Sequence, residues 1–135
     1  MNIQLIRNAT LRLEVAGRTL LIDPYFAPKH SLPSFAGVSA NPTVALPVPI
    51  QTITKDIDAC LVSHLHSDHF DEVAWTNLPQ TLGVFCQPCD EEDIKSKGFE
   101  NVTPITDRVT WHDITIARTP GQHGSGKPLE DMGLV

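Results

Sequence analysis

The sequence predicts a single domain of the α/β or α+β class spanning residues 1–135. Residues 3–22 alternate apolar and polar side chains, as in a strand with one buried face. Short apolar runs alternate with helix-like segments from residue 59 to residue 104, and a second stretch of alternation occupies residues 108–119. At 135 residues, the chain is long enough to bury a core of its own.

The N-terminal residues predict a β-hairpin that runs into a buried strand. The alternation through residues 11–15 breaks at Ala16 and Gly17, and apolar residues resume at 20–22. This strand ends where Asp23 precedes Pro24, because proline has no backbone N–H for a continuing ladder.

Residues 25–55 predict a long loop. Prolines at positions 28, 33, 42, 47 and 49 interrupt this segment, which has no clear hydrophobic period. Loops of this length in a compact domain are usually functional or disordered. We therefore leave two interpretations open, a wall of a substrate site and a packing segment.

The remaining elements follow in a regular order. The patterns predict a buried strand at 59–62, a helix at 71–78, a strand at 81–86, a helix at 89–98, a strand at 101–106 and a hairpin at 108–119. The hairpin is expected to turn at His112 and Asp113, which makes His112 a turn residue rather than a ligand.

The composition argues against several classes of function. The formal net charge is −6, with 10 Lys and Arg against 16 Asp and Glu, and no basic cluster that would bind a nucleic acid backbone. No apolar run approaches the ~20 residues of a membrane-spanning helix. The N-terminal residues lack a basic stretch followed by an apolar segment, so we expect a cytoplasmic protein.

The three cysteines do not suggest a disulfide framework, because their number is odd and small. Cys86 and Cys89 form a C-x-x-C motif between a predicted strand and a predicted helix, which is one setting for a redox pair. The alternative is that both are ordinary thiols at a strand-to-helix corner. Cys60 is expected to be a small buried apolar residue.

The segment SHLHSDHF at residues 63–70 is the densest group of potential metal ligands. His64 and His66 alternate, so on extended backbone they point the same way, while Leu65 turns into the core. Asp68 and His69 follow as the chain bends. Imidazole nitrogen combined with carboxylate oxygen suits Zn²⁺, with Mn²⁺ or Fe as alternatives.

Three motifs resemble the metallo-β-lactamase superfamily. HLHSDH matches the H-x-H-x-D-H signature, LLIDP resembles the family's strand ending in aspartate, and TPGQHGSG resembles the loop that carries a further metal histidine. The first segment and NPTVALP are similar to the branch that includes ascorbate 6-phosphate lactonase-like hydrolases. The resemblance implies a four-layer αββα sandwich with a mostly antiparallel or mixed sheet.

The resemblance also implies a ligand set. By position, it puts His64, His66 and His123 on a first metal and Asp68 and His69 on a second. Asp68 is also implied as the catalytic residue that orients the attacking water or accepts its proton.

Asp23 is implied by the same resemblance as an outer residue that holds the histidine segment in place by hydrogen bonding. From the residues alone, Asp23 could equally be a carboxylate that ends a strand before Pro24.

The chain departs from the family pattern after His123. The family continues with a carboxylate that bridges the metals and a last histidine, yet only Glu130 and Asp131 follow and no later histidine exists. The elements account for about one half of the sandwich, and GLV at the end resembles the start of a strand. We therefore expect the N-terminal part of a longer hydrolase, truncated at its C-terminus, with one metal or none.

These observations predict a metal-dependent hydrolase that acts on a small carbonyl or phosphoester substrate. The alternative is a metal-binding half domain that is inactive because it lacks the bridging carboxylate and the last histidine. A third hypothesis is a thiol redox protein using Cys86 and Cys89. Half a sandwich would leave an apolar sheet face bare, so we expect a homodimer or a larger assembly.

Overall fold

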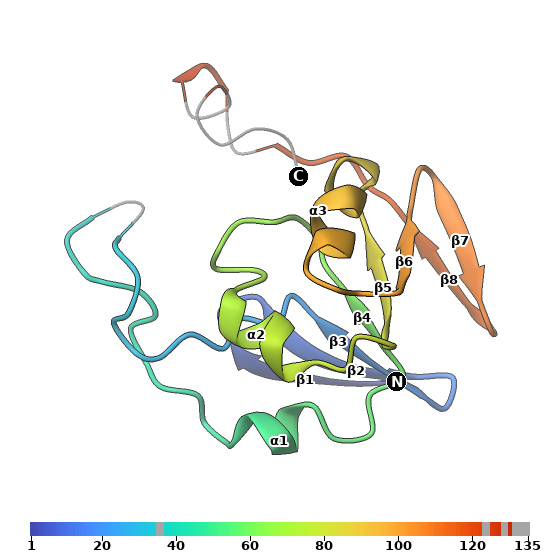
Figure 1. Ribbon diagram of the computed structural model, residues 1–135, viewed down its shortest axis with the longest axis horizontal. Coiled ribbons are helices and arrows are strands. Elements are labelled where there is room, and N and C mark those ends of the chain that lie inside the picture. Colours follow the sequence, from blue (N-terminus) through green and yellow to red (C-terminus); the bar gives the residue numbers. More distant parts are fainter. Residues whose placement is uncertain (35–36, 123–124, 128–129, 131–135) are drawn as a thin grey trace.

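The computed structural model describes residues 1–34, 37–122, 125–127 and 130. Its elements, in chain order, are β1 (Asn2–Arg7), β2 (Thr10–Val15), β3 (Arg18–Ile22), α1 (Ile50–Ile53), β4 (Ala59–Leu61), α2 (Glu72–Asn77), β5 (Gly83–Cys86), a 3₁₀ turn (Pro88–Asp90), α3 (Glu91–Ser96), β6 (Asn101–Pro104), β7 (Arg108–Trp111) and β8 (Ile114–Ala117). Six strands form one sheet in the order β1-β2-β3-β4-β5-β6, and β7 and β8 form a separate hairpin (Figure 1).

The main sheet is mixed, which confirms the predicted fold class. β1, β2 and β3 are antiparallel neighbours, whereas β3, β4, β5 and β6 are parallel. Parallel neighbours require crossover connections, and the segments that hold α1, α2 and α3 supply them. Within the described residues, no helix is both long and apolar enough to span a bilayer.

The two faces of the sheet bury different residues. Leu21, Cys60 and Val84 are in register and belong to the core beneath the helices, which also contains Phe70 and Ile94. Each fully buried side chain of this kind contributes about 1.5–3 kcal/mol. Figure 1 shows α2 and α3 against the strands and the β7–β8 hairpin beyond β6.

The opposite face has a smaller core under the hairpin. Leu20, Ala59 and Phe85 are buried there, and hairpin residues including Trp111 and Ile116 pack against them. The ring centroids of Phe85 and Trp111 lie 5.7 Å apart in an edge-to-face arrangement. The hairpin turns at His112 and Asp113 as predicted, with His112 at a φ of 51°.

The structure corrects the sequence prediction at two places. A turn at Asn8 and Ala9 divides the first alternating segment into β1 and β2, and Asn8 takes a φ of 51°, which asparagine tolerates better than most residues. The predicted loop 25–55 contains a helix, α1, whose Ile53 is 1% exposed. Burial of Ile53 in the main core explains a helix that has no periodic pattern of its own.

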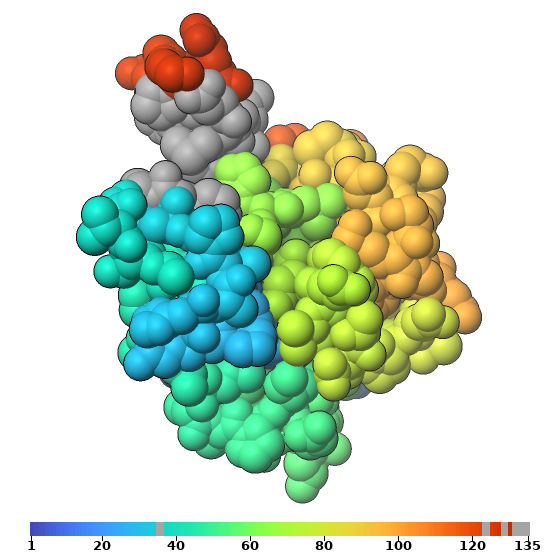
Figure 2. All heavy atoms as spheres, turned by 60° about the vertical axis from the view of Figure 1, so that its left-hand side comes forward, coloured from blue at the N-terminus to red at the C-terminus, as the bar shows by residue number. Residues whose placement is uncertain are grey.

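Arg7 fixes the beginning of the long 25–55 segment. Its Nη2 donates to the carbonyl oxygens of Tyr25 at 2.8 Å and Ala27 at 3.0 Å, and its Nη1 donates to the carbonyl of Val44 at 3.1 Å. The guanidinium also lies 4.9 Å from the Tyr25 ring centroid. Figure 2 shows the blue and cyan part of this segment beside the yellow-green segment that contains α2.

The parallel strands bring three segments together at one edge of the sheet. The strands β3, β4 and β5 point the same way, so the residues after their ends meet. Asp23 contacts Ser63, 40 positions away in the chain, and Ser63 contacts Gln87, 24 positions further on. Backbone bonds continue this pairing, from Asp23 N–H to the Leu61 carbonyl and from Val62 N–H to the Phe85 carbonyl, both at 2.9 Å. This edge is where ligands commonly bind in sheets of parallel strands.

Candidate active site

The histidine segment follows β4 directly and turns back on itself. The N–H groups of His69 and Phe70 both donate to the carbonyl of His66, at 2.9 and 3.1 Å. The imidazoles lie close together: the ring centroids of His64 and His66 are 4.5 Å apart with the rings edge-on, and those of His64 and His69 are 4.0 Å apart with the rings tilted. The structure therefore brings three of the predicted ligands into one cluster.

Asp23 contacts this segment through three hydrogen bonds. Its Oδ1 accepts from the Ser63 backbone N–H at 2.7 Å, and its Oδ2 accepts from the Ser63 hydroxyl at 2.8 Å. The same Oδ2 lies 2.9 Å from Nδ1 of His69. Asp23 is buried, with a φ of 45°, a backbone conformation that aspartate adopts more readily than branched residues.

Ser63 joins Asp23 to both neighbouring histidines, a role that the sequence did not reveal. Its hydroxyl lies 3.0 Å from Nδ1 of His64 and 3.3 Å from Nδ1 of His69. A partner on Nδ1 sets the orientation of the ring and makes Nε2 the nitrogen that would ligate a metal. The one available signal was position, because a hydroxyl residue directly precedes the first histidine.

The pKa of His69 reflects its position between two carboxylates. Burial lowers this pKa, but the hydrogen bond and charge of Asp23 and the charge of Asp68 outweigh burial, so the net shift is upward. A metal bound at Nε2 would therefore compete with a proton on this ring.

The donors near this cluster suit a transition metal in chemical type, because imidazoles and a half-buried carboxylate, Asp68, are clustered in one short segment. Across the described ranges, however, no group of three or more His, Cys, Asp or Glu donors converges as a metal site. His123, the predicted third ligand of the first metal, lies outside these ranges. The ligand assignments therefore stay predictions.

Asp71 follows the histidine segment and joins α2 to the beginning of the 25–55 segment. It caps α2 by accepting from Ala74 N–H at 3.1 Å, and it also accepts from Phe26 N–H at 2.9 Å. Burial raises the pKa of Asp71, while these backbone donors oppose that rise. The sequence placed Asp71 inside the first turn of the helix, and the structure makes it the N-cap.

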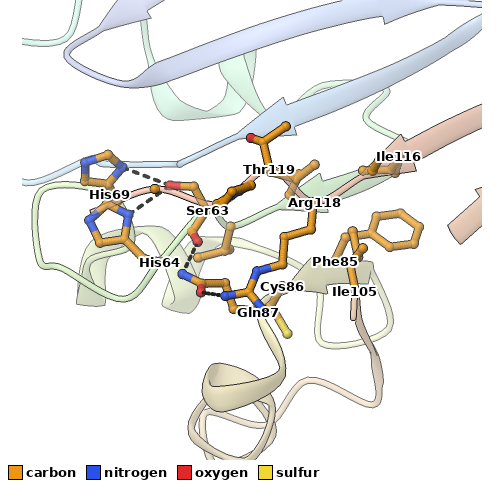
Figure 3. Close-up of a pocket in the computed structure, with 15 residues that line it drawn as sticks. Ser63, His64, His69, Phe85, Cys86, Gln87, Ile105, Ile116, Arg118 and Thr119 are labelled. Carbon is orange, nitrogen blue, oxygen red and sulfur yellow. Dashed lines mark hydrogen bonds between the residues drawn. The ribbon is translucent and has the colours of Figure 1, made fainter. Parts of the chain in front are cut away.

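A pocket of about 510 Å³ adjoins the histidine cluster. Figure 3 shows His64, His69 and Ser63 at one end, Phe85, Ile105 and Ile116 at the other, and Arg118 between them. Its lining residues are Leu61, Val62, Ser63, His64, His69, Phe85, Cys86, Gln87, Ile105, Ile116, Ala117, Arg118, Thr119, Pro120 and Gly121. None of these comes from the described residues of the 25–55 segment, so that part of the segment does not form a wall of this pocket.

Gln87 and Arg118 form the polar wall of the pocket, and sequence reasoning missed both. Gln87 is 7% exposed, and its Nε2 donates to the Ser63 carbonyl at 2.7 Å. Nη2 of Arg118 then donates to Oε1 of Gln87 at 2.9 Å. A chain of hydrogen bonds thus runs from the guanidinium to the residue that holds the histidines.

The cysteines do not have the properties of a redox pair. All three thiols are free. Burial raises the pKa of Cys86 to about 12, and burial together with the charge of Asp90 also raises the pKa of Cys89. Reactive cysteines need a lowered pKa, so the site argues against the thiol redox hypothesis.

The family model described as "Beta-lactamase superfamily domain" matches residues 18–134. The chain belongs to the metallo-β-lactamase superfamily. Among superfamily relatives, the "UPF0173 protein YddR" of Bacillus subtilis is 39% identical over 137 residues, an alignment that covers 98% of this chain and 54% of YddR.

Solved structures of the superfamily agree with this fold. A "possible metal-dependent hydrolase" from Veillonella parvula is 35% identical with a TM-score of 0.89. An isothiocyanate hydrolase from Delia radicum gut bacteria is 40% identical with a TM-score of 0.87. Both comparisons cover 98% of this chain and 52% of the other, so the chain spans about half the length of these superfamily relatives.

Proposed function

We propose that this chain carries the metal-binding part of a hydrolase that uses a metal-activated water on a small substrate with a carbonyl or phosphoester bond. The observation that carries the proposal is the cluster of His64, His66 and His69 at the end of β4. Ser63 and Asp23 hold the imidazoles of His64 and His69, and a substrate-sized pocket lies beside the cluster. The superfamily membership supports the same chemistry.

When bound, a divalent metal would lower the pKa of a coordinated water and polarise the electrophilic group of the substrate. His64 and His66, with His123, would hold Zn²⁺, or alternatively Mn²⁺ or Fe. Asp68 would orient the attacking water and accept its proton. Ser63 would keep the imidazole of His64 in its ligating orientation, and Asp23 and Ser63 together would do so for His69.

The electrophile is expected to be an unsaturated carbon or a phosphorus atom. The relative named as an isothiocyanate hydrolase acts on an unsaturated carbon, and the apolar end of this pocket would accept an aryl or alkyl group. Phenyl isothiocyanate therefore belongs in the substrate panel beside an activated ester, a lactone and a phosphodiester.

The test is hydrolysis of that panel by the chain loaded with Zn²⁺, Mn²⁺ or Fe²⁺. We expect His66→Ala to lose bound metal and activity together, because it removes a ligand. His112→Ala is the matched control, since His112 is exposed at the turn between β7 and β8 and is not part of the histidine cluster. Equal metal content in His66→Ala and the unmodified chain would exclude the proposed site.

The alternative function is metal binding without catalysis. Only Asp68 and His69 are candidates for a second metal, so we expect one ion per chain at most. Metal analysis of the purified chain measures this number. One bound ion with no hydrolysis across the panel would favour the inactive half domain, whereas two tightly bound ions would show that other ligands complete the second site.

We also propose that two copies of the chain associate through the face of β1 and β2 that carries Ile3 and Leu5. These side chains are 58% and 65% exposed, and they lie opposite Leu13 and Leu11 on the same face. Sedimentation should report a dimer that Leu5→Lys dissociates and that Val38→Lys, at a fully exposed loop position, leaves intact. A monomer at every concentration would contradict this proposal.

A further inference from the structure

The pocket beside the histidines has an unusual distribution of charge. Its described lining contains one arginine, two histidines and no aspartate or glutamate, although the chain as a whole has a formal net charge of −6. Apolar side chains form most of the remaining wall, among them Phe85, Ile105 and Ile116. A cation in such a place attracts a negatively charged group, since apolar walls lower the local dielectric constant.

No ion pair joins Arg118 to a carboxylate of the described chain. The charge of Arg118 does act on Asp90, whose pKa is raised chiefly by burial and lowered in small part by Arg118. Asp90 is not among the described lining residues of the pocket, so its carboxylate offsets the positive charge of the guanidinium only from outside the pocket.

The orientation of Arg118 depends on Gln87. The Ser63 carbonyl can only accept a hydrogen bond, so the amide nitrogen of Gln87 must face it and Oε1 must face away. This oxygen then accepts from one N–H of Arg118. No described residue pairs with the other donors of the guanidinium, which can therefore bind a ligand, and Gln87 acts as a positioning residue.

We propose that Arg118 is a specificity-determining residue that binds a carboxylate, or another planar oxyanion, of the substrate. This inference rests on the proposed hydrolase function and names the class of substrate. Phe85 and Ile116 lie at one end of the pocket and His64 at the other (Figure 3), so the apolar part of such a substrate would contact the first end and its scissile bond would face His64.

Arginine suits this role better than lysine would. Its planar fork of N–H groups matches the two oxygens of a carboxylate, and it stays charged at any physiological pH. Since Gln87 already restricts the side chain, less conformational entropy is lost when the anion binds.

The test measures binding to the metal-free chain by NMR titration, using benzoate and the neutral molecule benzyl alcohol as probes of similar size. We expect benzoate to bind about tenfold more tightly than benzyl alcohol. Arg118→Gln should remove that preference, and Arg118→Lys should retain part of it. Arg108→Gln is the matched control because Arg108 is exposed on the outer hairpin and faces Asp107.

Equal affinities of the unmodified chain for benzoate and benzyl alcohol would overturn the inference, as would unchanged benzoate binding in Arg118→Gln. If that variant does not fold, benzoate binding to Arg118→Lys as tight as to the unmodified chain would overturn it. The probes bind without metal or turnover, so the two proposals can fail separately. If the chain prefers benzoate to benzyl alcohol but hydrolyses no substrate of the panel, the proposed function alone is refuted. Hydrolysis without the preference would refute this inference alone.

Discussion

Asp23 and Ser63, 40 positions apart in the chain, are joined by two hydrogen bonds in which one carboxylate accepts from both the backbone N–H and the hydroxyl of the serine, at 2.7 and 2.8 Å. The same hydroxyl contacts Nδ1 of His64 and of His69. The orientation of two candidate ligands therefore depends on one side chain that is not itself a candidate ligand.

Ser63→Ala is expected to lower zinc affinity by about 10–100-fold, because partners of ligating imidazoles typically have effects of this size. Ser63→Thr keeps the hydroxyl and should bind zinc nearly as tightly as the unmodified chain. Competition with a chromogenic chelator measures both affinities. Ser67→Ala is the control, since Ser67 is exposed in the same segment. Unchanged zinc affinity in Ser63→Ala would show that the hydroxyl does not orient the ligands.

Arg7→Met is expected to reduce the free energy of unfolding by about 2–4 kcal/mol. The change removes a buried guanidinium and leaves the carbonyls of Tyr25 and Ala27 without their donor. Urea unfolding measures the loss. Arg108→Met, at an exposed arginine, should change stability by less than about 0.5 kcal/mol. A similarly small effect of Arg7→Met would mean that the 25–55 segment is held by its apolar contacts alone.

Asp58→Asn should remove a pH-dependent part of the stability. The N–H of Thr19 and the Arg18 guanidinium, both hydrogen-bonded to this carboxylate, hold the pKa of Asp58 below its ordinary value. A carboxylate whose pKa is lowered by folding stabilises the folded state at any pH above its ordinary, unfolded-state pKa. This stabilisation is lost as the pH falls through the pKa that the carboxylate has in the folded state. The pair is near the surface, so we expect a contribution of only about 1 kcal/mol.

Urea unfolding of the unmodified chain and of Asp58→Asn at about pH 7 and about pH 3 measures this contribution. The two proteins should differ at the higher pH and converge at the lower one. Asp107→Asn, whose carboxylate is exposed, is the control. A difference that persists unchanged in acid would assign the effect to packing rather than to charge.

Cys89 should be the one thiol of the folded chain that a disulfide reagent can reach, and its reaction should be slow because burial and the charge of Asp90 raise its pKa. Cys60 and Cys86 are buried and burial raises the pKa of both, whereas Cys89 is exposed. Titration of the folded, unmodified chain should therefore find one accessible thiol, and titration of folded Cys89→Ser should find none. In denaturant, all three thiols of the unmodified chain should react. Rapid reaction of Cys86 in Cys89→Ser would restore the redox hypothesis.

The local pattern of the sequence was sufficient for most of the elements. Period-two alternation located the strands near residues 11–22 and the final hairpin, and the helices predicted at 71–78 and 89–98 contain α2 and α3. These signals are local, because hydrophobic period, capping and turn chemistry act within a few residues. The sequence did not predict the turn at Asn8 or the helix α1, because neither segment has a local pattern that distinguishes it from the residues around it.

The residue types in the histidine segment were also readable from the sequence, and they indicated metal chemistry and the superfamily. What only the tertiary structure decided is which residues surround them. The parallel strands β4 and β5 bring Gln87 to Ser63, 24 positions away in the chain. The strand β8 returns to the same edge and brings Arg118 to Gln87, 31 positions away. No local signal encodes such contacts, since they depend on strand order and on the burial that selects it.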